Sequence, residues 1–164
     1  TKPVVAAVQG AAVGGGLGLA VSADFRAACP ESKFSANFTR LGFHPGFGLT
    51  ATLPRLIGQQ KTTMMFYTGR RIGGEEAFAM GLADVLVPKE QLRDAAMALA
   101  QEIAISAPIA VVSTRATMRQ GLVDLVRAAV NRESIEQDIQ RKTEDFKEGV
   151  AAMSARREPV FPWR

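Results

Sequence analysis

Residues 4–23 read VVAAVQGAAVGGGLGLAVSA, and this stretch decides the fold. It opens with a short apolar run, Val4 to Val8, that is typical of a buried strand. It continues through Gly14-Gly15-Gly16 into an apolar segment, Leu17 to Ala23, that predicts a helix. Glycines let the backbone adopt φ angles that other residues avoid, and free N–H groups at a helix start attract negative charge. The stretch therefore predicts a strand, a sharp turn and a helix whose first turn suits an oxyanion or a phosphate.

Composition limits the class of protein. The chain has 164 residues, of which 47% are hydrophobic, as expected of a globular domain with a sizeable core. No apolar run reaches the length of a membrane span and no charged leader precedes the first strand, so a cytoplasmic protein without a membrane partner is the default expectation. The net charge of +4 is mild and spread along the chain, which falls short of a nucleic-acid-binding surface.

The single cysteine, Cys29, excludes an intramolecular disulfide and a Cys/His metal cluster, so no metal site is expected. Free cysteine usually packs as a small apolar side chain. An inert, partly buried thiol is therefore the expected role of Cys29.

Sequence patterns predict further short strands, followed by helices. Strands are expected at residues 24–28, 34–36 and 84–88, and helices at 49–57, 59–67 and 75–80. A glycine-rich loop spans Gly42 to Gly48. From Glu90 the pattern is helical almost to the C-terminus. Within this stretch Pro108 interrupts the pattern and starts a new helix.

Separate motifs follow one another through the whole chain. They are Lys2 to Gly16, Leu41-Gly42 with Pro45-Gly46, Arg55 to Gly58, Thr68-Gly69-Arg70, Glu76 to Asp84, Val87-Pro88, Glu148-Gly149, Arg156-Arg157 and Pro159-Val160-Phe161. In this order and spacing the chain resembles the enoyl-CoA hydratase/isomerase family, also called the crotonase superfamily. The resemblance implies an α/β fold, a spiral of ββα units followed by a C-terminal helical region.

The resemblance also implies an organisation and a substrate. Residues 1–88 would form the second part of the spiral core, and residues 89–164 the helical trimerisation region and tail. Family members usually assemble as trimers or dimers of trimers, so a homo-oligomer is expected. They bind acyl-CoA thioesters, in which coenzyme A is part of the substrate, and no separate cofactor is expected.

In this family two backbone N–H groups hold the thioester oxygen, and the resemblance assigns one of them to Gly15, between Gly14 and Gly16. Negative charge gathers on that oxygen when the thioester becomes an enolate, and losing one such donor typically costs roughly 3 kcal/mol of transition-state stabilisation. The alternative, that these glycines only allow tight strand-to-helix packing, stays open.

The chain departs from the family pattern at its start. Family members carry a large N-terminal portion before the Lys2-Pro3-Val4 strand, including the loop that supplies the other oxyanion N–H group. Its absence here suggests one piece of a longer protein. The 164-residue chain alone is expected neither to bind acyl-CoA tightly nor to turn it over.

The second departure concerns two carboxylates. Hydratases of this family carry one catalytic glutamate three residues after the central glycine, where this chain has Gly18, and the other where it has Phe38. Hydration needs one group to activate water and another to deliver a proton to the α-carbon. Glycine and phenylalanine do neither.

His44 is the only histidine and the best replacement candidate, because an imidazole acts as acid or base near neutral pH. It precedes Pro45 and Gly46, which the resemblance places in the substrate pocket. The alternative is a histidine that only hydrogen-bonds the loop backbone.

Three polar residues, Ser35, Asn37 and Thr39, flank Phe38 and offer groups that orient water or substrate. Strand alternation would point Asn37 and Thr39 away from the Phe38 side. Aromatic residues in the same region, Phe38, Phe43 and Phe47, suit either an apolar acyl pocket or the core.

Near the C-terminus, the resemblance places Arg157 and Phe161, with Arg156, close to the adenine and phosphates of CoA, often those of a neighbouring subunit. A guanidinium matches phosphate in charge and geometry. A solvated basic tail is the alternative.

Two functions follow. The first is an acyl-CoA enzyme resembling enoyl-CoA hydratase/isomerase, in which Gly15 stabilises the thioester enolate and His44 transfers the proton. An isomerase or another enolate-forming reaction needs fewer acid and base groups than hydration, and so fits Gly18 and Phe38 better. The second is a non-catalytic acyl-CoA-binding or assembly protein of the same fold.

Overall fold

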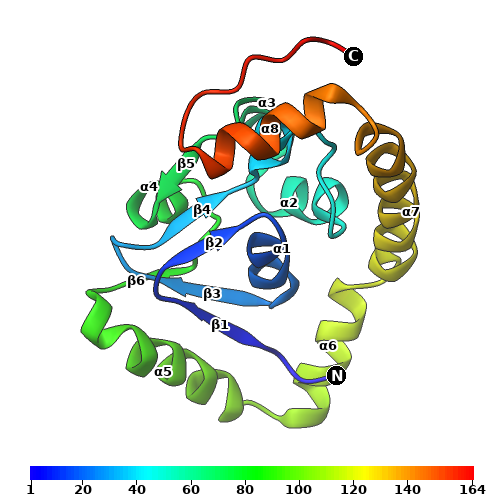
Figure 1. The fold of residues 1–164 in the computed structure, drawn as a ribbon. Helices are drawn as coiled ribbons and strands as arrows, with labels where there is room; N and C mark the ends of the chain where they lie inside the picture. Colours follow the sequence, from blue (N-terminus) through cyan, green and yellow to red (C-terminus); the bar gives the residue numbers. More distant parts are fainter.

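The computed structural model describes Thr1 to Arg164 and contains two small sheets enclosed by helices (Figure 1). The first sheet has three parallel strands, β1 (Val5–Val8), β3 (Phe25–Ala28) and β6 (Val85–Leu86). In the second, β2 (Ala11–Val13) is parallel to β4 (Lys33–Ser35), and β5 (Arg71–Gly73) is antiparallel to β4. Strands that follow each other in the chain lie in different sheets: β1 and β3 belong to the first sheet, β2 and β4 to the second. Helix α1 (Gly15–Ser22) connects β2 to β3. The chain therefore forms an α/β spiral of ββα units.

Helices complete the spiral and then form the rest of the chain. Before β6 they are η1 (Asn37–Leu41), α2 (Leu49–Ile57), α3 (Gln59–Thr68) and α4 (Gly74–Ala79). After β6 they are η2 (Lys89–Gln91), α5 (Leu92–Ala104), α6 (Pro108–Met118), α7 (Leu122–Gln140) and α8 (Glu144–Ser154). Helix α5 lies along β1, and α7 and α8 close the opposite side (Figure 1).

Most predicted elements are confirmed. The helix at 49–57 agrees with α2 residue for residue, and Pro108 begins α6 as expected. The short strands β2 and β5 were not predicted. Residues 37–41 form a 3₁₀-helix, so the expectation of strand alternation around Phe38 is wrong.

The main core fills the space between the second sheet and helices α1, α2 and α3. Its fully buried large side chains include Leu17, Phe34, Leu49, Leu53, Met65, Ile72 and Leu82. A smaller cluster under α5 contains Ala27, Cys29, Leu92 and Ala96. Cys29 is a free, buried thiol, which agrees with its predicted packing role.

Arg26 is the largest fully buried side chain, only 1% exposed. Its guanidinium donates hydrogen bonds to the Leu82 carbonyl at 2.6 Å and the Ala23 carbonyl at 3.1 Å, and forms an ion pair with Asp84 at 2.9 Å. Burial lowers the pKa of Arg26 below its ordinary value, although the charge of Asp84 opposes this. These bonds tie β3 to the segment that enters β6.

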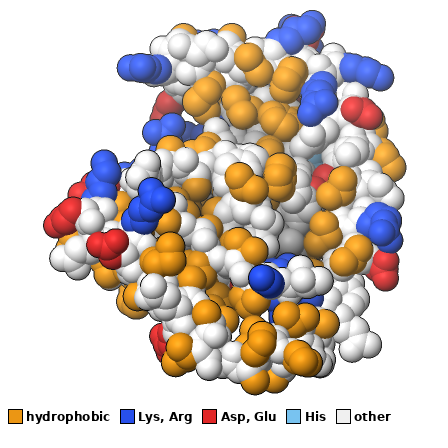
Figure 2. All heavy atoms as spheres, turned by 90° about the horizontal axis from the view of Figure 1, so that it is seen from below, with side chains coloured by type: hydrophobic (Ala, Val, Ile, Leu, Met, Phe, Trp, Pro, Cys, Tyr) orange, Lys and Arg blue, Asp and Glu red, His pale blue; other side chains and the backbone are white.

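The C-terminal helices leave many apolar side chains exposed, among them Ile105, Ile109, Met118 and Val123. Figure 2 shows apolar side chains spread over the face seen from below in Figure 1, where α5 lies. No single helix is long and apolar enough to cross a membrane. The segments Lys89–Ala104 and Pro108–Met118 meet the length and composition criteria only as a pair, bent by 105°.

Candidate active site at the start of helix α1

The glycine turn before α1 presents backbone N–H groups. Gly14 has φ 55° and ψ −117°, a conformation that favours glycine, and its N–H donates to the Ser35 carbonyl at 2.9 Å. Gly15 is the first residue of α1, where an N–H group has no acceptor within the helix, and no side chain caps this end. The positive end of the helix dipole lies at the same place. The turn thus has the features of an anion site, and the Gly15 N–H is the first donor of the helix.

Phe47 covers this end of α1. Its ring carbon Cδ2 lies 3.7 Å from the position that a Cβ atom on Gly15 would take, an ordinary van der Waals contact. A Cβ atom on Gly18 would lie only 2.4 Å from ring carbon Cδ1 of Phe47 and 2.7 Å from its Cβ. Phe47 also has φ 64°, which bulky residues rarely adopt. The space that a side chain at position 18 would need is therefore filled by the Phe47 side chain.

This contact predicts a strong coupling between positions 18 and 47. Gly18→Ala is expected to lower the free energy of unfolding by about 1–3 kcal/mol, because its Cβ would overlap Phe47. In a Phe47→Gly background the same change should cost less than about 0.5 kcal/mol, since the ring is gone. Denaturant unfolding of the two single variants and the double variant measures the coupling.

Gly16→Ala is the matched control, because its Cβ would meet nothing within 4 Å in the same helix. Equal costs of Gly18→Ala in both backgrounds would show that Phe47 does not occupy this space in solution.

A buried carboxylate on α7 holds the loop that carries Phe47. Glu133 is 2% exposed, and its two oxygens accept hydrogen bonds from Gly48 N at 2.7 Å, Thr50 N at 3.1 Å and Thr50 Oγ1 at 2.6 Å. Gly48 and Thr50 form the start of α2. A negative charge at a helix N-terminus is favourable, so Glu133 both caps α2 and fixes the loop before it.

Two further side chains of α7 bind the same loop. Gln137 Nε2 donates to the His44 carbonyl at 2.9 Å, and the His44 N–H donates to Gln140 Oε1 at 2.5 Å. Positions 133, 137 and 140 share one helix face at steps of four and three. This spacing was the only sign in the sequence that the three side chains act together, and it does not show that they bind the loop before α2.

The imidazole of His44 bonds within its own loop. Its Nδ1 lies 2.7 Å from the Pro45 carbonyl oxygen. A carbonyl only accepts hydrogen bonds, so this contact requires the hydrogen on Nδ1, and in the neutral imidazole Nε2 then has the lone pair. His44 is partly buried, and it does not line the large cavity described below. Its role in proton transfer stays a prediction.

Phe38 and Asn37 both lie against the glycine turn. The Phe38 ring is 3.7 Å and the Asn37 Oδ1 atom 3.9 Å from the position of a Cβ on Gly14. Asn37 therefore lies on the same side as Phe38, because the 3₁₀ turn removes the strand alternation. Phe38 is 7% exposed and packs edge-on against Phe43, with ring centroids 5.6 Å apart.

The other two polar candidates in this region have structural bonds. Ser35 Oγ donates to the Gly69 carbonyl at 3.1 Å, and Thr39 Oγ1 donates to the Phe66 carbonyl at 2.6 Å. Of the loop glycines, Gly46 faces α7, because a Cβ there would lie 2.5 Å from Gln137 Nε2.

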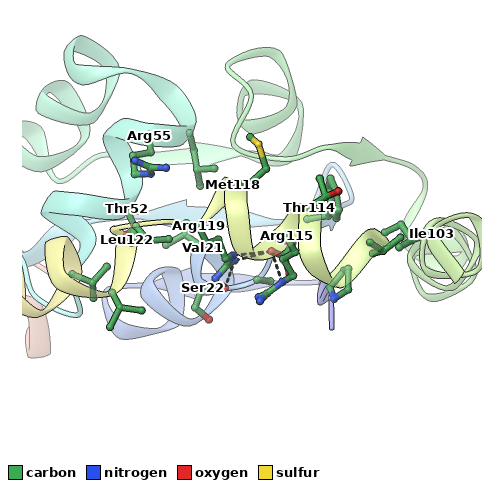
Figure 3. A pocket seen from close by; sticks show the side chains of 18 of the residues that line it. Val21, Ser22, Thr52, Arg55, Ile103, Thr114, Arg115, Met118, Arg119 and Leu122 are labelled. Carbon is green, nitrogen blue, oxygen red and sulfur yellow. Dashed lines mark hydrogen bonds and ion pairs between the residues drawn. The ribbon is translucent and has the colours of Figure 1, made fainter. Parts of the chain in front are cut away.

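A large cavity opens beside Phe47. Its volume is about 930 Å³, and Gly18, Val21, Phe47, Leu56 and Val111 are among the mainly apolar residues that line it. It lies between α1, α2 and the helices α6 and α7 (Figure 3). A volume of this size suits a small organic ligand.

An ion cluster forms one wall of this cavity. Asp24 accepts hydrogen bonds from Arg115 Nε at 2.9 Å and Arg119 Nε at 2.9 Å (Figure 3). It also accepts a hydrogen bond from the backbone N–H of Val4 at 2.8 Å. Burial alone would raise the pKa of the Asp24 carboxyl. The bonds from Arg115 and Val4 and the charges of Arg119 and Arg115 outweigh burial and hold the pKa below its ordinary value. Asp24 therefore anchors α6 to the core as a carboxylate.

The C-terminal candidates lie beside α8. Arg157 donates two hydrogen bonds to the Glu148 carboxylate, at 2.6 and 2.8 Å, and Val160 N donates a third at 2.8 Å. The bond from Arg157 lowers the pKa of Glu148 to about 2, and Glu148 in turn raises the pKa of Arg157. Phe161 is half-buried. A phosphate at Arg157 would share the guanidinium with Glu148, and the binding roles of Arg157 and Phe161 stay predictions.

Comparison with known proteins decides the family. The family model described as enoyl-CoA hydratase/isomerase matches residues 1–163. The chain belongs to the enoyl-CoA hydratase/isomerase family. This places it in the crotonase superfamily, as the motifs predicted.

Relatives and solved structures agree with this membership. The crotonyl-CoA hydratase of Syntrophomonas wolfei is 36% identical over 98% of this chain and 62% of its own length. The (E)-benzylidenesuccinyl-CoA hydratase of Thauera aromatica has the same identity and coverage. The crystal structure of carnitinyl-CoA hydratase from Mycobacterium avium matches with a TM-score of 0.90 at 30% identity, over 99% of this chain and 64% of that one. The family fold is thus confirmed, and the chain spans about 62% of the length of these two curated relatives.

Proposed function

We propose that the full-length protein binds acyl-CoA thioesters and stabilises the thioester enolate at the start of α1. The observation that carries this proposal is the uncapped helix start at Gly15, the position that the family uses to hold the thioester oxygen. The Gly15 N–H and the helix dipole favour the charged enolate oxygen over the neutral thioester. The names of the relatives, which act on CoA thioesters, support the same substrate class.

The reaction that fits this site is an enolate-forming proton transfer rather than hydration. A base removes a proton from the α-carbon, the electron pair moves to the thioester oxygen, and a proton returns at the α- or γ-carbon. Hydration would need two positioned acid and base groups, and positions 18 and 38 carry none. The Phe47 side chain fills the space beside Gly18, which supports a site without bound water there.

His44 is the proposed base. With the hydrogen on Nδ1, its Nε2 has the lone pair that accepts a proton. The bond from Nδ1 to the Pro45 carbonyl fixes the ring. The bond that Gln137 donates to the His44 carbonyl and the bond that Gln140 accepts from the His44 N–H fix the loop.

A non-catalytic acyl-CoA-binding protein is the second candidate. The observation in its favour is that His44 does not line the cavity next to Gly18 and Phe47. A ligand in that cavity would then meet no free acid or base, because Asp24 is held by two arginines.

Proton exchange in heavy water separates these candidates. The full-length protein is incubated with hexanoyl-CoA and with the β,γ-unsaturated hexenoyl-CoA, and proton NMR follows the α-protons, the double bond and any hydroxyacyl product. We expect exchange of α-protons and migration of the double bond without hydration. Binding without exchange would favour the second candidate, and a hydroxyacyl product would overturn the proposed reaction.

We also propose that the protein is a homo-oligomer, a trimer or hexamer as is usual in the family. The exposed apolar side chains of α6 and of the adjoining segments, including Ile105, Ile109 and Met118, support this assembly.

A further inference from the structure

The charges that line the large cavity do not balance. Its wall contains one carboxylate, Asp24, and three guanidinium groups, Arg55, Arg115 and Arg119, so two positive charges are in excess. The rest of the wall is mainly apolar. A concave, mainly apolar wall with an excess of one charge strengthens the field inside it and attracts ligands of the opposite charge. The cavity thus suits a ligand with an apolar body and an anionic group.

Arg55 is the arginine available for that group. Arg115 and Arg119 are both held by Asp24, at 2.9 Å each. The Arg55 side chain forms no hydrogen bond or ion pair with the rest of the chain, and it enters the cavity from α2 (Figure 3). A free guanidinium offers paired N–H donors that match the two oxygens of a carboxylate.

The same cavity reaches the proposed thioester site. Gly18 and Phe47 line it, and the Phe47 ring lies 3.7 Å from the position of a Cβ on Gly15. An acyl chain whose thioester oxygen lies at Gly15 would therefore pass the ring of Phe47 and enter the cavity. Its far end would then share the cavity with Arg55.

We infer that the acyl group carries an anionic far end, as in the CoA thioester of a dicarboxylic acid, and that Arg55 binds this carboxylate. This inference rests on the proposed acyl-CoA function and adds a substrate class to it. A free aliphatic carboxylate has the same apolar chain and anion, and the experiment below distinguishes it from the thioester.

Matched ligands test the inference by calorimetric titration of the full-length protein. Adipyl-CoA and hexanoyl-CoA have acyl chains of equal length and differ only in the terminal carboxylate. We expect the dissociation constant of adipyl-CoA to be about 10- to 100-fold lower, the usual effect of a hydrogen-bonded charge pair. Succinyl-CoA with butyryl-CoA, and suberyl-CoA with octanoyl-CoA, give the same comparison at other lengths.

Arg55→Gln is expected to abolish the preference for the dicarboxylic thioester, so that adipyl-CoA and hexanoyl-CoA then bind with equal affinity. Arg55 is exposed on α2, so this change leaves the core intact. Arg93→Gln, at an exposed position of α5 outside the cavity, is the control for a general loss of positive charge.

The outcomes separate the two proposals. Equal affinity for adipyl-CoA and hexanoyl-CoA at every length, or a preference that survives Arg55→Gln, overturns the inference and leaves the acyl-CoA function standing. If no thioester binds, the proposed function fails and the inference with it. If free hexanoate binds in an Arg55-dependent way while neither adipyl-CoA nor hexanoyl-CoA binds, the ligand is a free carboxylate and the thioester assignment is wrong.

Discussion

Gly15→Pro is expected to slow α-proton exchange of bound hexanoyl-CoA by about 100- to 1,000-fold, because it removes the N–H group that holds the enolate oxygen. Proline is well tolerated at the first position of a helix, where the N–H has no helical acceptor and the required φ is near that of proline. Position 15 is this first position of α1. The variant therefore removes one donor and keeps the helix. Exchange rates at saturating thioester, followed by proton NMR in heavy water, measure the effect.

Gly15→Ala is the matched control. It keeps the N–H group, and its Cβ would lie 3.7 Å from the Phe47 ring, an ordinary contact. We expect its exchange rate to stay close to that of the original protein, and the unfolding free energies of the two variants to agree within about 1 kcal/mol. Equal exchange rates for the proline and alanine variants would exclude the Gly15 N–H from catalysis.

Glu133→Ala is expected to lower the free energy of unfolding by about 3–5 kcal/mol. The change removes three hydrogen bonds to a buried carboxylate and leaves Gly48 N and Thr50 N at the start of α2 without an acceptor. Each buried polar group left unpaired costs about 1–3 kcal/mol, and hydrogen bonds to charged groups are stronger than neutral ones. Urea unfolding followed by circular dichroism measures the loss.

Two variants on the same helix control this prediction. Glu136 pairs with the exposed Arg132, so Glu136→Ala should cost less than about 1 kcal/mol. Glu133→Gln keeps one oxygen acceptor but turns an amide donor toward a backbone donor, and an intermediate loss is expected. A Glu133→Ala loss no larger than that of Glu136→Ala would mean that α7 does not hold the loop.

Local signals in the sequence were enough for the glycine turn and the helix that follows it. The break at Gly14 to Gly16 requires unusual backbone angles, and glycine is the residue that adopts them. The helix α2 was predicted to follow the glycine-rich loop that ends at Gly48. By contrast, β2 contains two alanines and β5 a glycine, residue types that are depleted in strands, so no strand was predicted there.

The contacts that shape the site join residues far apart in the chain. Phe47 covers Gly18, and Glu133 binds Gly48 and Thr50. The sequence around one residue of such a pair does not show which distant residue it contacts, because the contact depends on how whole helices and loops pack. Arg26 is a similar case. A charged residue in a strand would be expected at the surface, but Arg26 is buried and pairs with Asp84, which is distant in the sequence.

The alternation of strands between two sheets also determines how the chain reaches its fold. Val5 pairs with Phe25, Ala11 with Lys33, and Ala27 with Val85, so no two paired strands form a hairpin. Each pairing must close a long loop before any hydrogen bond between the strands forms. The chain therefore loses conformational entropy before the strand contacts that offset this loss have formed. The core should therefore assemble more slowly than the helices of residues 92–154, which form from local contacts. Strand pairing, rather than helix formation, is expected to limit the folding rate.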